Sequence, residues 1–220
     1  AGDALNGNVT VSDDATESIA ATVLSTIGGG TSGTVTVTNA ITITGDTSQA
    51  IAALDTALTK VTAGTAKVTL SDTPSLDNLK KINDATSGTI KILNKAITYS
   101  GTATVLAAAL DGTVQDTSGA ALTGAMTITG ADPSPAELQT INNATGGNVI
   151  VPDKTVTLSG TAAVLEEALA GTVQDGSGDA ITGTVTITGA DPTPAQLKIL
   201  NDSVAGTIVV PDKTVALSGT

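Results

Sequence analysis

The sequence predicts an α/β protein built as a tandem-repeat β-α solenoid, in which short threonine-rich strands form a sheet with a row of short helices packed on it. Three observations lead to this fold class. The tripeptide Ser-Gly-Thr begins at Ser100, Ser159 and Ser218, which sets a 59-residue period. Residues 101–159 and 160–218 are identical at 37 of their 59 positions. Within each copy, strand-like alternation gives way to helix-like periodicity, which is typical of repeats that stack on one another.

The repeat divides the chain into one array, residues 1–220, of about 3.5 copies. The copies span roughly residues 12–70, 71–129, 130–188 and 189–220, and each splits into two β-α coils of about 30 residues. The array stops in mid-repeat at Thr220 without an atypical capping repeat, so we expect a segment excised from a longer chain. Open sheet edges at both ends of such a segment favour end-to-end self-association.

Capping residues predict where the helices begin and end. Ser134 to Glu137 and Thr193 to Gln196 form capping boxes with proline at the first helical position. One helix is expected from Ala195 to Val204 and another from Ala162 to about Ala170. Three glycines follow where helices need left-handed stops: Gly147, Gly171 and Gly206.

Alternation predicts strands with one buried face and one threonine face open to water. Val185 and Ile187 should point inward, and the threonines at 184, 186 and 188 outward. The apolar pairs 41 and 43, 68 and 70, and 156 and 158 follow the same rule. The turns Pro152-Asp153-Lys154 and Pro211-Asp212-Lys213 are expected to join neighbouring strands. Since helices pack about 10 Å apart and strands about 4.8 Å, each helix should cover two strands of one sheet. The hydrogen-bonding order of the strands does not follow from the sequence.

Composition argues against most functional classes. The chain has no His, Cys, Phe or Trp, and its net charge is −12. Nucleic acid is disfavoured as a partner, because phosphates need basic residues and bases need aromatic ones. No apolar run reaches the length of about 18 residues that a spanning helix needs, so membrane insertion is not expected. Acid–base chemistry would fall to Asp153-Lys154, which sits in a polar turn, or to Glu166-Glu167, which the preceding copy lacks. We therefore expect no catalytic residues, no bound cofactor and no enzyme activity.

The segment from Asp175 to Asp179 is the best metal candidate. Its oxygen-bearing side chains alternate with glycines, as at the start of a calcium loop. The sister loop, Asp116 to Ala120, lacks the third oxygen, and no bidentate Glu follows. A surface turn and a weak calcium site with Asp175 and Asp179 as ligands both remain open.

Two repeated polar series have a structural and a functional reading. Asn83, Asn142 and Asn201 fall in one register, either as a ligand-contacting ladder or as amides that satisfy backbone groups near helix C-termini. The Thr-x-Thr rows resemble the hydroxyl arrays of ice-binding solenoids, but threonine also suits any wetted strand face. The rows comprise Thr36, Thr38, Thr42, Thr44, Thr127, Thr129, Thr155, Thr157, Thr184, Thr186 and Thr188, and Lys67 and Lys91 would interrupt them.

A family resemblance adds to these observations. A strand ending in Thr-Gly or Leu-Ser-Gly-Thr, an Ala-rich helix and then Gly-Thr-Val resembles the repeats of very large bacterial cell-surface, adhesin-like proteins, those of cyanobacteria and other aquatic bacteria above all. Residues 160–173 carry this likeness best. It implies an extracellular, stalk-like or coat-forming role in which each repeat has its neighbours as partners. The alternative is a module that binds ice, carbohydrate or calcium through the threonine face or the aspartate loops.

Overall fold

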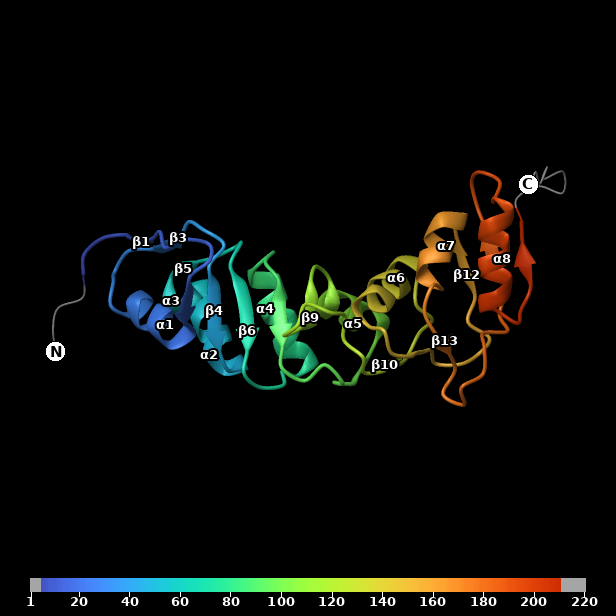
Figure 1. Ribbon diagram of the computed structural model, residues 1–220, viewed down its shortest axis with the longest axis horizontal. Coiled ribbons are helices and arrows are strands. Elements are labelled where there is room, and N and C mark those ends of the chain that lie inside the picture. Colours follow the sequence, from blue (N-terminus) through green and yellow to red (C-terminus); the bar gives the residue numbers. More distant parts are fainter. Residues whose placement is uncertain (1–4, 211–220) are drawn as a thin grey trace. The chain divides into compact units, whose positions relative to one another are not determined.

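A computed structural model describes residues 5–210 as an α/β protein with parallel sheets (Figure 1). The strands of every sheet among these residues pair in parallel. Parallel neighbours need a crossover connection, and helices supply it. The predicted α/β class is confirmed. Two compact units divide the chain, Ala1–Lys95 with Ala109–Ala121 and Ala96–Ala108 with Leu122–Thr220. The expected turn at Pro211 and the last Ser-Gly-Thr lie outside the described residues.

The first unit contains two parallel sheets. One has the order β1-β3-β5, and the other has the order β2-β4-β6-β7-β9. Partners in neighbouring strands are about one coil apart in sequence, as in the pair Ser18↔Thr42 and the pair Thr42↔Lys67. The strands are β1 (Val9–Val11), β2 (Ser18–Ala20), β3 (Val35–Val37), β4 (Thr42–Gly45), β5 (Val61–Thr62), β6 (Lys67–Leu70), β7 (Ile90–Ile92) and β9 (Val114–Asp116).

Helices connect these strands. The helices are α1 (Ala21–Gly29), α2 (Thr47–Leu54), α3 (Thr56–Thr59) and α4 (Leu76–Ala85). Helix α2 begins with a capping box between Asp46 and Gln49, and Ser75 caps α4. Helices α1 and α2 pack side by side, as do α2 and α4.

The second unit also contains two parallel sheets, with orders β8-β10-β11-β13 and β12-β14-β15. The strands are β8 (Tyr99–Gly101), β10 (Met126–Ile128), β11 (Val149–Ile150), β12 (Leu158–Gly160), β13 (Val173–Gln174), β14 (Val185–Ile187) and β15 (Ile208–Val209). The helices are α6 (Pro135–Ala144), α7 (Ala162–Ala168) and α8 (Pro194–Ser203). Helix α5 (Ala103–Leu110) begins in this unit and ends in the first.

Three connections link the two sheets of the second unit. The chain leaves β11 for β12 through residues 151–157, returns from β12 to β13 through α7, and leaves again for β14 through residues 175–184. The two sheets are therefore joined by three covalent crossings rather than by one linker.

The capping boxes at Ser134 and Thr193 are confirmed. The Ser134 hydroxyl accepts a hydrogen bond from the Glu137 N–H at 3.3 Å, and the Glu137 carboxylate accepts one from the Ser134 N–H at 2.9 Å. Thr193 and Gln196 repeat this arrangement. Helix α8 runs from Pro194 to Ser203, one residue earlier at each end than expected. Helix α7 ends at Ala168 rather than near Ala170.

The predicted alternation of buried and open strand positions is also confirmed. Val185 and Ile187 are at most 1% exposed, whereas the threonines at 184, 186 and 188 are half-buried or exposed. The apolar residues at 41, 43, 68, 70, 156 and 158 are all buried. Small aliphatic side chains supply most of the core, at about 25 cal/mol for each Å² of apolar surface removed from water.

The single sheet expected from the sequence is wrong, because the described strands form four sheets. Helix α7 joins β12 and β13, which belong to different sheets. Hence the four strands of one 59-residue repeat are divided between two sheets. For the same reason, Pro152-Asp153-Lys154 does not join hydrogen-bonded neighbours: β11 pairs with β10 and β13, whereas β12 pairs with β14.

The left-handed helix stops expected at Gly147, Gly171 and Gly206 are also wrong. The left-handed glycines of residues 5–210 lie elsewhere, at positions 112, 119, 130, 178 and 189. What requires glycine at the predicted positions is the close approach of a neighbouring segment. A Cβ atom at Gly147 would lie 2.5 Å from the carbonyl oxygen of Thr123, and one at Gly206 would lie 2.0 Å from that of Gly183.

Candidate functional site

Two of the carboxylates singled out from the sequence, those of Glu167 and Asp153, have hydrogen-bond partners within the protein. The Glu167 carboxylate on α7 accepts a hydrogen bond from the Gln139 amide on α6. The Asp153 carboxylate accepts one from the Thr155 N–H at 2.7 Å and one from its hydroxyl at 2.5 Å. These bonds, the hydroxyl bond first, hold the pKa of Asp153 below its ordinary value. Each group stabilises its own turn or helix pair, and the structure does not bring the two together.

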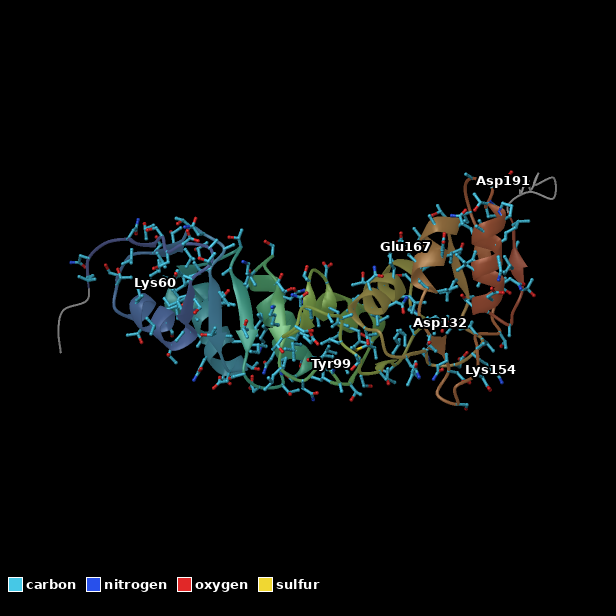
Figure 2. The ribbon with its side chains drawn as sticks, viewed as in Figure 1. Lys60, Tyr99, Asp132, Lys154, Glu167 and Asp191 are labelled. Atoms are coloured by element: carbon cyan, nitrogen blue, oxygen red, sulfur yellow. The ribbon has the colours of Figure 1, made fainter. Side chains whose placement is uncertain are left out.

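The segment from Asp175 to Asp179 forms a turn between β13 and β14. One oxygen of the Asp175 carboxylate accepts from the N–H groups of Ser177 at 2.9 Å and Asp179 at 2.8 Å. The Asp175 N–H donates to the Asp179 carbonyl at 2.9 Å, which closes the turn. The Asp179 carboxylate lies 3.6 Å from the ammonium group of Lys154, which is on the loop between β11 and β12 (Figure 2). Both carboxylates therefore have a role that needs no metal.

The sister loop uses the same geometry. The Asp116 carboxylate accepts hydrogen bonds from the Ser118 hydroxyl at 2.6 Å and from the Ser118 and Ala120 N–H groups at 2.8 and 2.9 Å. These bonds, with the Ser118 hydroxyl first, hold the pKa of Asp116 below its ordinary value. Gly119 and Gly178 take up the left-handed conformation at the same place in the two turns. The shared feature is thus an aspartate that organises a tight turn.

Metal ligands do not gather elsewhere in the part of the chain that the structure describes. No group of three or more His, Cys, Asp or Glu side chains is placed to hold an ion there. Weak calcium binding at Asp175 and Asp179 remains a prediction.

The asparagine series is placed near helix ends, as one of its two readings predicts. Asn142, at the end of α6, is 7% exposed, and its amide donates to the Glu167 carbonyl in the last turn of α7 at 3.3 Å. Its Oδ1 atom is buried without a hydrogen-bond partner. Asn83 is half-buried and Asn201 is exposed. The backbone-satisfying role is confirmed for Asn142.

The threonine rows are divided among the sheets. Thr10, Thr36 and Thr62 are exposed and lie in register across β1, β3 and β5. Thr42 and Thr44 lie on β4, in the other sheet of the first unit. Thr155 and Thr157 precede β12 and belong to no strand. The longest in-register threonine row among residues 5–210 therefore spans three strands.

A group of buried threonines was not recognised in the sequence. Thr31, Thr86 and Thr145 are at most 5% exposed, and each lies at or near the start of the segment that connects a helix to the next strand. The Thr145 hydroxyl donates to the Gly124 carbonyl at 2.7 Å and accepts from the Gly147 N–H at 2.9 Å. Thr86 makes equivalent bonds to Ala66 and Gly88, and Thr31 to Gly7 and Gly33. The available signal was a threonine two residues before a glycine, which occurs at each of these three positions.

Shallow hollows accompany the helix ends. One of them has a volume of about 420 Å³ and lies at the end of α4, beside Asp84 and Asp111. Asp84 is paired with Lys80 at 2.6 Å, and the Asp111 carboxylate accepts from the Gly112 N–H at 2.9 Å. Both carboxylates at this hollow therefore have partners within the protein.

Comparison with protein-family models, curated proteins and solved structures finds no match to this chain. Among the described helices, none combines the length and the apolar character that crossing a bilayer requires.

Proposed function

We propose that this chain is a structural segment of a large extracellular bacterial surface protein, a tandem-repeat β-α solenoid that acts as a spacer or coat element and catalyses no reaction. One observation carries the proposal: the contacts between successive coils recur with the same 59-residue period as the sequence. Met126 pairs with Tyr99 and Val149, and Val185 pairs with Leu158 and Ile208.

The bridges flanking the helices repeat in the same way. Leu122 pairs with Thr145, and Ile181 pairs with Val204. The N–H groups that follow, at positions 146 and 205, donate to the carbonyls at 122 and 181 at 2.7 and 2.8 Å. A chain whose neighbouring copies dock by identical pairings extends by addition of copies, as solenoids do. The three crossings between the sheets of the second unit favour a stiff element over hinged domains.

Deleting one whole repeat tests this role. Removal of residues 130–188 joins Thr129 to Gly189, which reproduces the Thr129-Gly130 junction of the intact chain. The spacer predicts a folded protein that is shorter by about 20 Å, the span of two packed helices. Removal of residues 130–174 is the control, because it breaks the 59-residue register and should prevent cooperative folding.

Small-angle X-ray scattering at several concentrations supplies the measurement. A compact globule of this length has a radius of gyration of about 17 Å. The spacer predicts a clearly larger value that persists at infinite dilution and falls when residues 130–188 are removed. A value as small as that of the globule, or unfolding of the in-register deletion, would contradict the proposal. A radius that grows with concentration would indicate the end-to-end association expected from open sheet edges.

The exposed row of Thr10, Thr36 and Thr62 favours ice binding as a second candidate function. The row presents hydroxyls and methyls at the regular strand spacing of about 4.8 Å. Thr36→Lys places a charge at its centre and should abolish thermal hysteresis if the row binds ice. The matched control is Thr157→Lys, at an exposed position outside any strand. Absence of hysteresis in the unaltered protein excludes this candidate.

A further inference from the structure

Two lysines stand on the open face of a sheet that otherwise presents mainly hydroxyls. Lys67 on β6 pairs with Thr42 on β4, and Lys91 on β7 pairs with Thr69 on β6. The two lysines are thus diagonal neighbours on one face of the sheet. Because parallel strands lie about 4.8 Å apart and two residues rise about 6.6 Å, positions so related lie about 8 Å apart, within reach of two long side chains.

These side chains surround a hollow of about 250 Å³. Its lining residues are Thr42, Lys67, Val68, Thr69, Thr89 and Lys91. The Lys91 ammonium donates to the Thr117 carbonyl at 3.3 Å. Within residues 5–210, the Lys67 ammonium makes no hydrogen bond or ion pair and is exposed. The hollow therefore offers two cationic groups and three hydroxyls, and no carboxylate lines it.

The charge of this region is opposite to that of the chain. The stretch from Lys60 to Lys95 holds six of the nine lysines and three of the 21 acidic residues, in a protein of net charge −12. At physiological salt, exposed charges are largely screened beyond about 8 Å. Distant acidic groups therefore contribute little to the field inside the hollow, which Lys67 and Lys91 line.

The fold itself does not require these lysines. Ala125 precedes Met126 on β10 as Lys67 precedes Val68 on β6. Ile150 pairs with Thr127 as Lys91 pairs with Thr69. The second unit thus builds the same strand pair with an alanine and an isoleucine in these places. The cationic character is an added property of one sheet face.

We propose that this hollow binds the carboxylate or sulfate group of an acidic polysaccharide. Two hydrated ammonium groups supply charge, and the threonine hydroxyls donate to anionic oxygens and to sugar hydroxyls. A nucleic acid fits less well, because no aromatic side chain lines the hollow to stack a base. The proposal is independent of the spacer role, which needs no ligand.

Nuclear magnetic resonance titration tests the site with four probes: a galacturonate tetramer, a sulfated dextran oligomer, neutral dextran and a single-stranded DNA oligomer. The two anionic saccharides should shift the amide resonances of residues 42, 67, 69, 89 and 91, and neutral dextran should not. The relative affinity of the carboxylated and sulfated probes identifies the source of the anion. Shifts spread over all surface lysines, equal binding of neutral dextran, or tighter binding of a single-stranded DNA oligomer would each overturn the proposal.

Variants provide a matched control. Lys67→Ala with Lys91→Ile installs the residues found at the equivalent places in the second unit, so folding should be retained. Loss of each lysine should weaken binding of the two anionic saccharides about tenfold, or about 1.4 kcal/mol. Lys154→Ala with Lys198→Ala changes the net charge equally, outside the hollow, and should alter affinity less than about twofold. Equal losses in both double variants would refute a local site.

Discussion

The hydroxyl of Thr145 donates a hydrogen bond to the carbonyl oxygen of Gly124 at 2.7 Å, across 21 positions of sequence. The same hydroxyl accepts from the Gly147 N–H at 2.9 Å and also lies 3.2 Å from the Leu122 carbonyl. One buried side chain thereby satisfies backbone groups of two successive coils. Parallel strands of two or three residues leave many such groups at their ends, and a buried polar group without a partner is costly.

Replacing Thr145 by valine keeps its shape and removes these bonds. We expect Thr145→Val to lower the free energy of unfolding by about 1–3 kcal/mol, because buried carbonyl and N–H groups lose their partner. Urea unfolding followed by tyrosine fluorescence measures this change, since Tyr99 is the only aromatic residue and lies in the same unit. The exposed Thr157→Val is the control and should change stability by less than about 0.5 kcal/mol. Equal effects of the two substitutions would show that the buried hydroxyl contributes nothing.

One repeat later, valine occupies the position equivalent to Thr145, so the reverse substitution can be made there. Val204 bridges to Ile181 as Thr145 bridges to Leu122, and it is 6% exposed. Val204→Thr should place a hydroxyl between the Gly183 carbonyl and the Gly206 N–H, and stabilise the protein by about 0.5–1.5 kcal/mol. The same unfolding assay measures the gain. A loss of stability would mean that residues 181–206 do not reproduce the geometry of residues 122–147.

Tyr99 makes stability depend on alkaline pH. Burial of this residue, which is 6% exposed (Figure 2), raises the pKa of its phenol above the ordinary value of 10.0. The unfolded chain loses the phenolic proton above about pH 10 while the folded chain keeps it, so stability falls with pH in that range. Absorbance of tyrosinate should rise only on unfolding.

The matched variant for this prediction is Tyr99→Leu, since Leu158 occupies the same place in the next repeat and is also buried. Its stability should be insensitive to pH between 9 and 11, apart from what the lysines contribute to both proteins. Titration of the phenol in the folded protein near pH 10 would contradict this prediction.

Asp116 makes the stability of the protein depend on pH in the acidic range. Because its pKa is lowered on folding, it adds stability above its unfolded value near 4, and that contribution is lost as the pH falls through the folded value. Asp116→Asn should therefore reduce stability at pH 7 and flatten the decline between pH 5 and 2. Parallel pH profiles for the unaltered protein and Asp116→Asn would refute a role for the carboxylate.

How much of the fold could be predicted differs between local and non-local features. Ser134 and Thr193 mark helix starts because capping is a contact between residues three apart, which the sequence displays directly. The alternation at Val185 and Ile187 is equally local. The division into four sheets is not, since β11 pairs with β13 rather than with β12, which comes next in the chain. Pairings of two or three residues carry too little side-chain information to select a partner.

For the candidate sites too, local features could be predicted from the sequence and non-local contacts could not. Asp116 and Asp175 were recognised as repeated loop residues, but whether their oxygens face a metal or their own backbone depends on the turn geometry. Thr145 was not singled out from the sequence as a site residue, although its buried hydroxyl bonds to backbone groups. The hydroxyl's partner lies 21 residues away, and no local rule connects the two.

Glycine at position 147 was predicted for a left-handed conformation, but the structure explains it by crowding, and the two explanations predict different mutants. A Cβ atom there would lie 2.5 Å from the Thr123 carbonyl oxygen and 2.6 Å from that of Gly124. Because both atoms belong to a neighbouring segment, Gly147→Ala must push the paired coils apart. We expect a loss of about 2 kcal/mol or more, in the range of overpacked core substitutions.

Gly176→Ala is the control for that substitution. Gly176 lies in the aspartate turn, its added Cβ would meet nothing within 4 Å, and it is not left-handed. Alanine there should be neutral or stabilise by about 0.4–1 kcal/mol, because the unfolded chain loses conformational freedom. If Gly147 were needed only for its backbone angles, Gly147→Asn would restore most of the stability lost in Gly147→Ala, since asparagine tolerates the left-handed region. Crowding predicts instead that asparagine, which also carries a Cβ atom, is at least as damaging as alanine.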